Sequence, residues 1–341
     1  MVKSPKCVGF IFFCFLALFA QALQAGQIES LTDSLEHKAR SYTLNNEFDK
    51  AIDCYREVIS IKIRFLGEKN IETAKSYNNI ANVYEEFEEY KMALMFYKKA
   101  LQIKQEAYPT HPSIGHSYHN MGVVYRKMGE FDKSEDYYQQ ALDLKLAKLG
   151  NTDISVANTY NNMAILYEEN GDLKKATYYY QLEIKTIENK LGHTNTRTAD
   201  AHFNLASAYF KWGKYGLAIK HYLIDLEINK EVLDSDHAKI AKTLNNLGVA
   251  YKANGNLTKA IESYNEALFI KNKAPKAWGT ELAVTYANLA KAYHRLKNYK
   301  YAIDNYQKAI DIYGNYTSKE NANKINELKS QIENCNNKYG G

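Results

Sequence analysis

The strongest constraint on the fold of this chain is a tyrosine that recurs at a nearly fixed interval. Each step is 42 residues except one of 41, and the positions are Tyr42, Tyr84, Tyr125, Tyr167, Tyr209, Tyr251 and Tyr293. A second series keeps the same period at Tyr55, Tyr97, Tyr138, Tyr180, Tyr222, Tyr264 and Tyr306. A period of this size predicts a solenoid, because each unit buries its apolar face only against its neighbours. We therefore expect about seven repeats.

Each repeat has the pattern of two amphipathic helices joined by a turn. In the fourth repeat, Asp153 is a predicted N-cap, and apolar residues follow at spacings of three and four between Val156 and Tyr167. Gly171 is expected to end this first helix, because glycine accepts the left-handed backbone that a helix end needs. A second helix is predicted from Leu173 to Leu191, and Asn195 is the next N-cap. The fold class is therefore all-α.

Small residues recur with the tyrosines. In the first helices they are Ala39, Ala81, Gly122, Ala164, Ala206, Gly248 and Ala290, and in the second helices Ala51, Ala93, Ser134, Ala176, Ala218, Ala260 and Ala302. Small side chains allow two helix axes to approach closely while tyrosines fill the flanking space. Fourteen of the 29 tyrosines are thus explained as core rather than as a base-stacking surface.

This pattern resembles the tetratricopeptide repeat over about residues 30 to 314. The ~42-residue unit is longer than the usual 34, and with Leu191-Gly192 closing a second helix and the pair Asn161-Asn162 it is similar to the repeats of kinesin light chains. The resemblance implies a right-handed superhelical solenoid whose first helices line a concave peptide-binding surface. Kinesin binding is not expected, since no long heptad segment precedes the repeats.

The N-terminus has the features of a targeting segment. Lys3 and Lys6 precede an apolar run from Cys7 to Ala20, and cleavage is expected after Ala22 or Ala25. We therefore assign residues 1–25 to a signal peptide, 26–317 to the solenoid, and 318–341 to a C-terminal capping helix and tail. The predicted location is exported, either secreted or periplasmic. An uncleaved membrane anchor is the alternative, although the run is shorter than the ~20 residues of a spanning helix.

No catalytic, metal or cofactor motif is recognisable. His116 and His119 lie three apart on one predicted helix face, but no cysteine or carboxylate of that helix completes a metal site. The net charge of +5 comes from interspersed charges, which is typical of a solvated helical surface rather than of a nucleic-acid interface. We expect a non-enzymatic protein without cofactor that does not bind nucleic acid.

One asparagine position is retained in six consecutive first helices. The row is Asn79, Asn120, Asn162, Asn204, Asn246 and Asn288. Asparagine is unfavourable inside a helix, so its retention needs a reason. One hypothesis is that the amides grip the backbone of a bound peptide, since a carboxamide both donates and accepts. The other is that they brace adjacent repeats.

Neighbouring side chains would set the specificity of such a groove. The predicted lining in the fifth to seventh repeats is Phe203, Phe210, Lys211, Lys242, Lys252, Lys291, His294 and Arg295. This set is basic with two aromatics and suits an acidic segment carrying an apolar anchor; an ordinary solvated face is the alternative. The predicted function is a protein- or peptide-binding scaffold, with a self-assembling element or a sensor subunit as alternatives. We also expect Glu183 to pair with His202 across a repeat seam.

Overall fold

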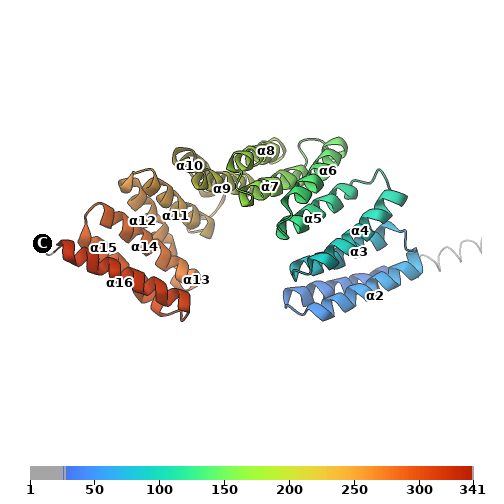
Figure 1. Cartoon of the computed structure of the whole chain (residues 1–341), viewed down its shortest axis with the longest axis horizontal. Coiled ribbons are helices and arrows are strands. Elements are labelled where there is room, and N and C mark those ends of the chain that lie inside the picture. Colours follow the sequence, from blue (N-terminus) through green and yellow to red (C-terminus); the bar gives the residue numbers. More distant parts are fainter. Residues whose placement is uncertain (1–25, 27, 340–341) are drawn as a thin grey trace, which may run out of the picture. The chain divides into compact units, whose positions relative to one another are not determined.

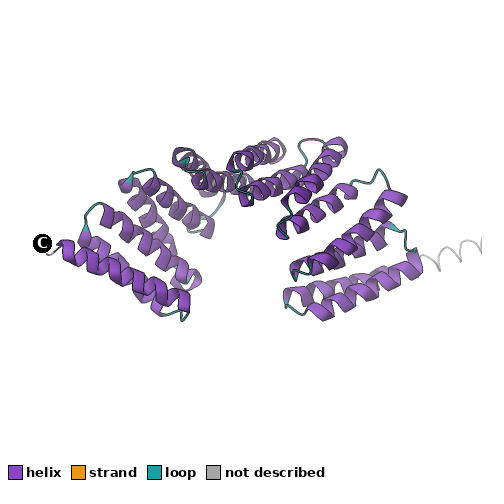
Figure 2. Ribbon diagram, in the orientation of Figure 1, coloured by secondary structure: helices purple, strands orange, loops and turns teal. Residues whose placement is uncertain are grey.

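The computed structural model describes residues 26 and 28–339, and in this range it contains helices and no strand (Figure 2). The chain divides into two compact units, of which the first ends at Gly150 and the second begins at Asn151. Each unit is a series of helical hairpins, labelled along the chain in Figure 1. The described residues form seven hairpins in all, which confirms the all-α repeat fold predicted from the tyrosine period.

The first unit holds three hairpins. The helix over 28–44 contacts α2 through the ion pair of Glu36 and Lys62, α3 pairs with α4, and α5 pairs with α6. The bounds are α2 Phe48–Leu66, α3 Ile71–Glu86, α4 Tyr90–Ala107, α5 Ser113–Lys127 and α6 Phe131–Leu149.

The second unit holds four hairpins and two further helices. Its bounds are α7 Ile154–Glu169, α8 Leu173–Leu191, α9 Thr196–Lys211, α10 Tyr215–Val232, α11 Ala238–Ala253, α12 Leu257–Lys271, α13 Pro275–Trp278, α14 Thr280–Arg295, α15 Tyr299–Gly314 and α16 Lys319–Tyr339. The short α13 lies in the connection between the sixth and seventh repeats and leaves the 42-residue step from Tyr251 to Tyr293 unchanged. Leu328 and Cys335 of α16 are buried in a cluster with Tyr306 and Tyr313 of α15, so α16 covers the last hairpin.

The predicted alternation of small and large residues forms the core. The recurring alanines are fully buried, and so are the tyrosines of the second helices, with Tyr97, Tyr138 and Tyr264 at 0% exposure. Two repeats have glycine where the others have alanine. A Cβ atom on Gly248 would lie 2.6 Å from the Tyr264 ring, and one on Gly122 would lie 2.7 Å from Tyr138. In these two repeats the ring therefore packs directly onto the backbone of the first helix.

The helix ends agree with the sequence prediction. Asp153 accepts a hydrogen bond from the backbone N–H of Ser155, and Asn195 accepts from Arg197 and Thr198. Gly171 follows α7 with a φ of +82°, in the left-handed region that favours glycine. Across residues 28–339, no helix combines the length and apolarity needed to cross a membrane. The predicted signal peptide lies outside the described residues.

Candidate functional site

The asparagine row is half-buried along the first helices of both units. In the first unit, the Asn79 amide donates to the Glu36 carboxylate over 3.4 Å. Burial and the charge of Glu85 raise the pKa of the Tyr97 phenol, whereas a hydrogen bond with Asn120 lowers it. Both amides thus contact the preceding repeat, as the brace hypothesis requires.

In the second unit the row is used in more than one way. Asn246 forms a hydrogen bond that lowers the pKa of Tyr222, against the raising effect of burial. Asn288 accepts from the Lys252 ammonium at 3.4 Å. Asn162 instead donates to the carbonyl oxygen of Asn158 in its own helix, and no hydrogen bond of Asn204 is present within the described residues. Bracing contacts to the preceding repeat therefore occur at Asn246 and Asn288.

A recurring polar arrangement follows the row. In the first unit, the Tyr97 hydroxyl donates to Glu85 at 2.9 Å, and Lys127 of the next first helix pairs with the same carboxylate at 2.9 Å. In the second unit, Tyr180 donates to Glu168 at 3.2 Å, and Lys211 of the next first helix pairs with Glu168. We call this set of tyrosine, glutamate and following lysine the carboxylate bridge. It neutralises Lys211, which the sequence had suggested as a free cation.

The carboxylate bridge is broken at Tyr264. The position that holds Glu85 and Glu168 is occupied there by Lys252, whose ammonium lies 6.0 Å from the centre of the Tyr264 ring. A lysine cannot accept a hydrogen bond. The Tyr264 hydroxyl is accordingly buried without a partner in the part of the chain that the structure describes.

Lys252 itself lies in a cationic surrounding. Arg295 of α14 donates to the Lys252 carbonyl oxygen at 3.1 Å. Burial, followed by the charges of Lys291 and Arg295, lowers the pKa of Lys252 to about 8. Lys291 is partly compensated by Glu327 of α16 at 3.2 Å. Among the described residues no carboxylate pairs with Lys252, so this position has a local excess of positive charge.

A cavity of about 190 Å³ lies between α9, α10 and α11. Its lining residues are Ser207, Phe210, Lys211, Tyr222, Asn246 and Val249. Phe210, Lys211 and Asn246 were predicted groove residues, and the fold brings them together although Asn246 lies 35 positions after Lys211 in sequence. Sequence reasoning missed Ser207, Tyr222 and Val249. The recurrence of Tyr222 indicated core packing but not that its hydroxyl would face a cavity.

The remaining predicted groove residues lie apart from this cavity lining. Phe203 packs edge-on against Tyr222, with ring centroids 5.4 Å apart, and the Lys242 ammonium lies 5.1 Å from the Phe203 ring centre. His294 contacts the rings of Tyr299 and Tyr306. These contacts are aromatic and cation–π, so they leave Lys242 without a carboxylate partner among the residues described.

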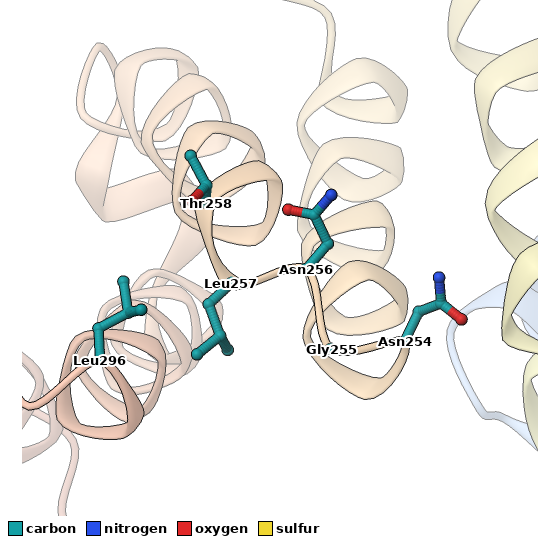
Figure 3. A pocket seen from close by; sticks show the side chains of 6 residues that line it. All are labelled: Asn254, Gly255, Asn256, Leu257, Thr258 and Leu296. Atoms are coloured by element: carbon teal, nitrogen blue, oxygen red, sulfur yellow. The ribbon is translucent and has the colours of Figure 1, made fainter.

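A second depression lies at the turn between α11 and α12. It is lined by Asn254, Gly255, Asn256, Leu257, Thr258 and Leu296 (Figure 3). The Asn256 side chain caps α12 by accepting from the Lys259 N–H at 3.1 Å. Its polar groups therefore serve the helix end, and it is a weaker candidate than the cavity between α9, α10 and α11.

The predicted pair of Glu183 and His202 is wrong. Glu183 accepts from the Asn161 amide of its own repeat at 3.0 Å, and His202 contacts His221 and Glu188 instead. Burial raises the pKa of Glu183 to about 7. The prediction failed because it considered only the following repeat, whereas the partner comes from the preceding helix of the same hairpin. No set of three or more His, Cys, Asp or Glu residues within the described range is arranged to hold a metal ion.

Comparisons with known proteins agree with this repeat class. The family model described as Tetratricopeptide repeat matches residues 30–106, 88–147, 113–186, 155–223 and 197–273, and a second model of the same description matches 283–316. Together these matches span most of the sequence. The chain therefore belongs to the tetratricopeptide repeat family.

Solved structures show the same fold at low sequence identity. BtubC (BKLC) from P. vanneervenii matches with a TM-score of 0.57 and 21% identity, over 70% of this chain and 91% of that chain. The apo form of RapI has a TM-score of 0.70 and 18% identity, over 89% and 82%. A kinesin light chain-like protein from Podosopora anserina has a TM-score of 0.53 and 21% identity, over 59% and 95%. A search of curated protein sequences found no significant match.

Proposed function

We propose that this chain is a scaffold that binds a protein or peptide segment along the first helices of its second unit. The observation that carries the proposal is the cavity where Phe210, Lys211 and Asn246 converge. An aromatic wall suits an apolar side chain, and an amide at its edge suits the adjoining peptide group because it both donates and accepts. The Tyr222 hydroxyl and Ser207 bond to one another at 3.0 Å, which leaves the cavity with an ordered polar edge.

The charge of the partner follows from the broken carboxylate bridge at Tyr264. Two equivalent tyrosines donate to Glu85 and Glu168, whereas Tyr264 has no acceptor and stands beside Lys252 and Arg295. A carboxylate of a bound segment would offset this local positive charge. We therefore expect an acidic residue of the partner near Lys252 and an apolar residue in the cavity one repeat earlier.

Phenylalanine substitutions test the cavity. Phe210→Ala removes its aromatic wall and should abolish capture of partners from a lysate or an exported fraction, with a stability loss of about 1–2 kcal/mol because the half-buried ring also packs against the core and Tyr215. Phe269→Ala is the matched control, because Phe269 of α12 is 71% exposed and lies outside the cavity. Equal capture by wild type and Phe210→Ala would contradict the proposal.

The asparagine row is tested by Asn162→Ala combined with Asn204→Ala. If these amides grip a peptide backbone, the double variant should keep its stability and lose partner capture. A loss of about 1 kcal/mol or more per site with capture retained would instead identify a bracing role.

A charge reversal tests the acidic partner. Lys252→Glu rebuilds the carboxylate bridge, since the new side chain can accept from Tyr264 and pair with Arg295. This variant should be more stable than wild type yet bind its partner more weakly, and raised salt should weaken binding in wild type. Lys185→Glu on the exposed face of α8 carries the same charge change as a control. Unchanged binding by Lys252→Glu would exclude an acidic contact there.

The location of the scaffold is proposed from residues outside the described range. The two lysines and the apolar run before Ala22 support export, and a reporter fused after residue 25 should leave the cytoplasm. Retention of that fusion in the cytoplasm would contradict this part of the proposal.

A further inference from the structure

A ladder of aromatic ring contacts recurs in four repeats. Two rings come from the first helix and one, between them, from the second. In three repeats these are Tyr77, Phe96 and Tyr84, then Tyr118, Tyr137 and Tyr125, then Tyr160, Tyr179 and Tyr167. The centre ring lies 5.2–5.4 Å from the second tyrosine in each of them, at 9–12° between planes. Each ladder thus fastens the two helices of its hairpin through uncharged rings.

The fifth repeat builds the ladder from histidines. The rings of His202 on α9 and His221 on α10 lie nearly parallel, with centroids 5.2 Å apart and 18° between planes, and those of His221 and Tyr209 have centroids 5.6 Å apart and 17° between planes. Trp212 extends the stack beyond Tyr209, with centroids 6.4 Å apart. The two Nδ1 atoms lie 2.9 Å apart, so one imidazole donates to the other. That bond requires at least one neutral ring, because a protonated imidazole has no lone pair to accept with.

The surroundings of the pair favour its neutral form. Burial, the proximity of His202 and the charge of Lys220 on α10 lower the pKa of His221 to about 4. Burial also lowers the pKa of His202, although Glu188 of α8 at 3.8 Å opposes this, while His193 and Lys220 add to the lowering. Glu188 is itself held by His193 at 2.9 Å. A proton on each ring would therefore place two positive charges in van der Waals contact with each other. The one carboxylate beside them, that of Glu188, already pairs with His193.

The histidine pair joins two of the helices that line the proposed binding cavity. His202 precedes Phe203, and His221 precedes Tyr222, whose rings form the neighbouring contact between the same two helices. Ser207, Phe210 and Tyr222 of these helices line the cavity. Separation of α9 from α10 would thus displace two walls of the site at once.

We infer that the His202–His221 pair is an acid-sensitive switch: protonation breaks the ladder, loosens the fifth hairpin and releases a segment bound in the adjoining cavity. This inference rests on the proposed function for the identity of the site that is released. The loosening of the hairpin stands on the ladder geometry alone. With this switch, the scaffold would hold its partner at neutral pH and release it in an acidic compartment.

The size of the effect follows from proton uptake. If the pKa of His221 returns from about 4 to about 6.5 when the hairpin opens, the opening equilibrium constant rises on the order of twentyfold between pH 7 and pH 5. The sign is fixed because each folded-state pKa is lowered: stability is present above the unfolded pKa and is lost as pH falls toward the folded one. The buried carboxylates Glu183 and Asp225 have raised pKa values and oppose this trend, so variants must isolate the histidines.

The first experiment measures hydrogen-exchange protection factors of α9 and α10 at pH 7 and pH 5, after correction for intrinsic exchange. Wild-type protection should fall on the order of twentyfold. His202→Tyr with His221→Tyr rebuilds the ladder of the fourth repeat and should abolish the fall. His202→Leu with His221→Ser, which reproduces Leu244 and Ser263 of the sixth repeat, is the alternative neutral pair if the tyrosines do not fit. Equal falls in wild type and both variants would overturn the inference.

The second experiment measures binding of a peptide selected from a random library at pH 7.5. The affinity of the wild type for this peptide should drop at pH 5 and recover at pH 7.5. The variant with His202→Tyr and His221→Tyr should bind the peptide equally at both pH values. The same drop in wild type and in the tyrosine variant would overturn the switch and leave the scaffold intact. Failure to select any peptide would contradict the proposed function. The protection factors would still show whether protonation of the two histidines loosens the fifth hairpin.

Discussion

Replacement of tyrosine by phenylalanine at equivalent buried positions should change stability in opposite directions. Tyr264 and Tyr180 hold the same place in their repeats and are 0% and 4% exposed. The Tyr264 hydroxyl has no partner among the described residues, whereas that of Tyr180 donates to the Glu168 carboxylate at 3.2 Å. Phenylalanine fills the same volume, so no cavity term enters and the hydroxyl alone decides the sign.

The magnitudes follow from what each hydroxyl does. A buried polar group without a partner costs about 1–3 kcal/mol, so Tyr264→Phe should stabilise the second unit by about 1 kcal/mol. A hydrogen bond to a charged acceptor contributes about 1.5–3 kcal/mol, so Tyr180→Phe should destabilise by about that amount, at the lower end for a 3.2 Å contact. Tyr222→Phe removes neutral bonds to Ser207 and Asn246 and should cost about 1–2 kcal/mol.

Stability is measured by urea unfolding followed by circular dichroism. The midpoint concentrations report stability directly where the dependence of the unfolding free energy on urea is the same in both variants. Because hairpins of a solenoid couple mainly to their neighbours, native-state hydrogen exchange in α12 and α8 should show where each change acts. The reasoning would be refuted by a Tyr264→Phe variant that loses stability as Tyr180→Phe does, since its hydroxyl would then have to be bonded.

Three further outcomes are expected. Glu183→Gln should stabilise the protein at pH 8 by up to roughly 3 kcal/mol and change its stability little at pH 4. The folded-state pKa of Glu183 is raised to about 7, so the ionised side chain destabilises the fold only above that pH, and glutamine removes this cost. Equal effects at both pH values in thermal melts would argue against this. Tyr167→Ala should cost about 3–5 kcal/mol and reduce exchange protection most in α7 and α8, and uniform loss along the second unit would contradict nearest-neighbour coupling. Gly248→Ala should displace the Tyr264 ring and therefore gain less stability than Gly216→Ala, whose added Cβ meets no atom within 4 Å. If calorimetry ranked the two variants the other way, the Tyr264 ring would have to move aside without cost.

The asparagine row shows where sequence reasoning stopped. Its period predicted six equivalent positions, and the fold keeps them on equivalent faces of the first helices. The amides nevertheless have different partners: Asn288 accepts from Lys252, whereas Asn162 donates within its own helix. A side chain's partner depends on what its neighbours offer at that repeat, and those neighbours have diverged.

The charged lining was predicted by position but not by pairing. Lys211 was expected to attract an acidic partner, yet it pairs with Glu168, 43 residues earlier. The sequence did contain a matching pair, because Glu85 of the second repeat and Lys127 of the third hold the same positions as Glu168 and Lys211 two repeats later. Recognising that spacing as an ion pair required knowing that consecutive first helices lie side by side.

The repeat, its two helices, their ends and their packed residues were all predictable from the amino-acid pattern. Those features depend on local propensity and on a period in which small and large residues alternate, so each copy repeats the same evidence. The packed helices were needed to show that Tyr264 lacks an acceptor among the described residues, that Glu183 bonds to Asn161, and that His202 contacts His221. The physical reason is that a hydrogen bond or ion pair requires contact within about 3–4 Å between residues on different helices. The 42-residue period fixes which helices are neighbours, but the packing of each seam fixes which side chains touch.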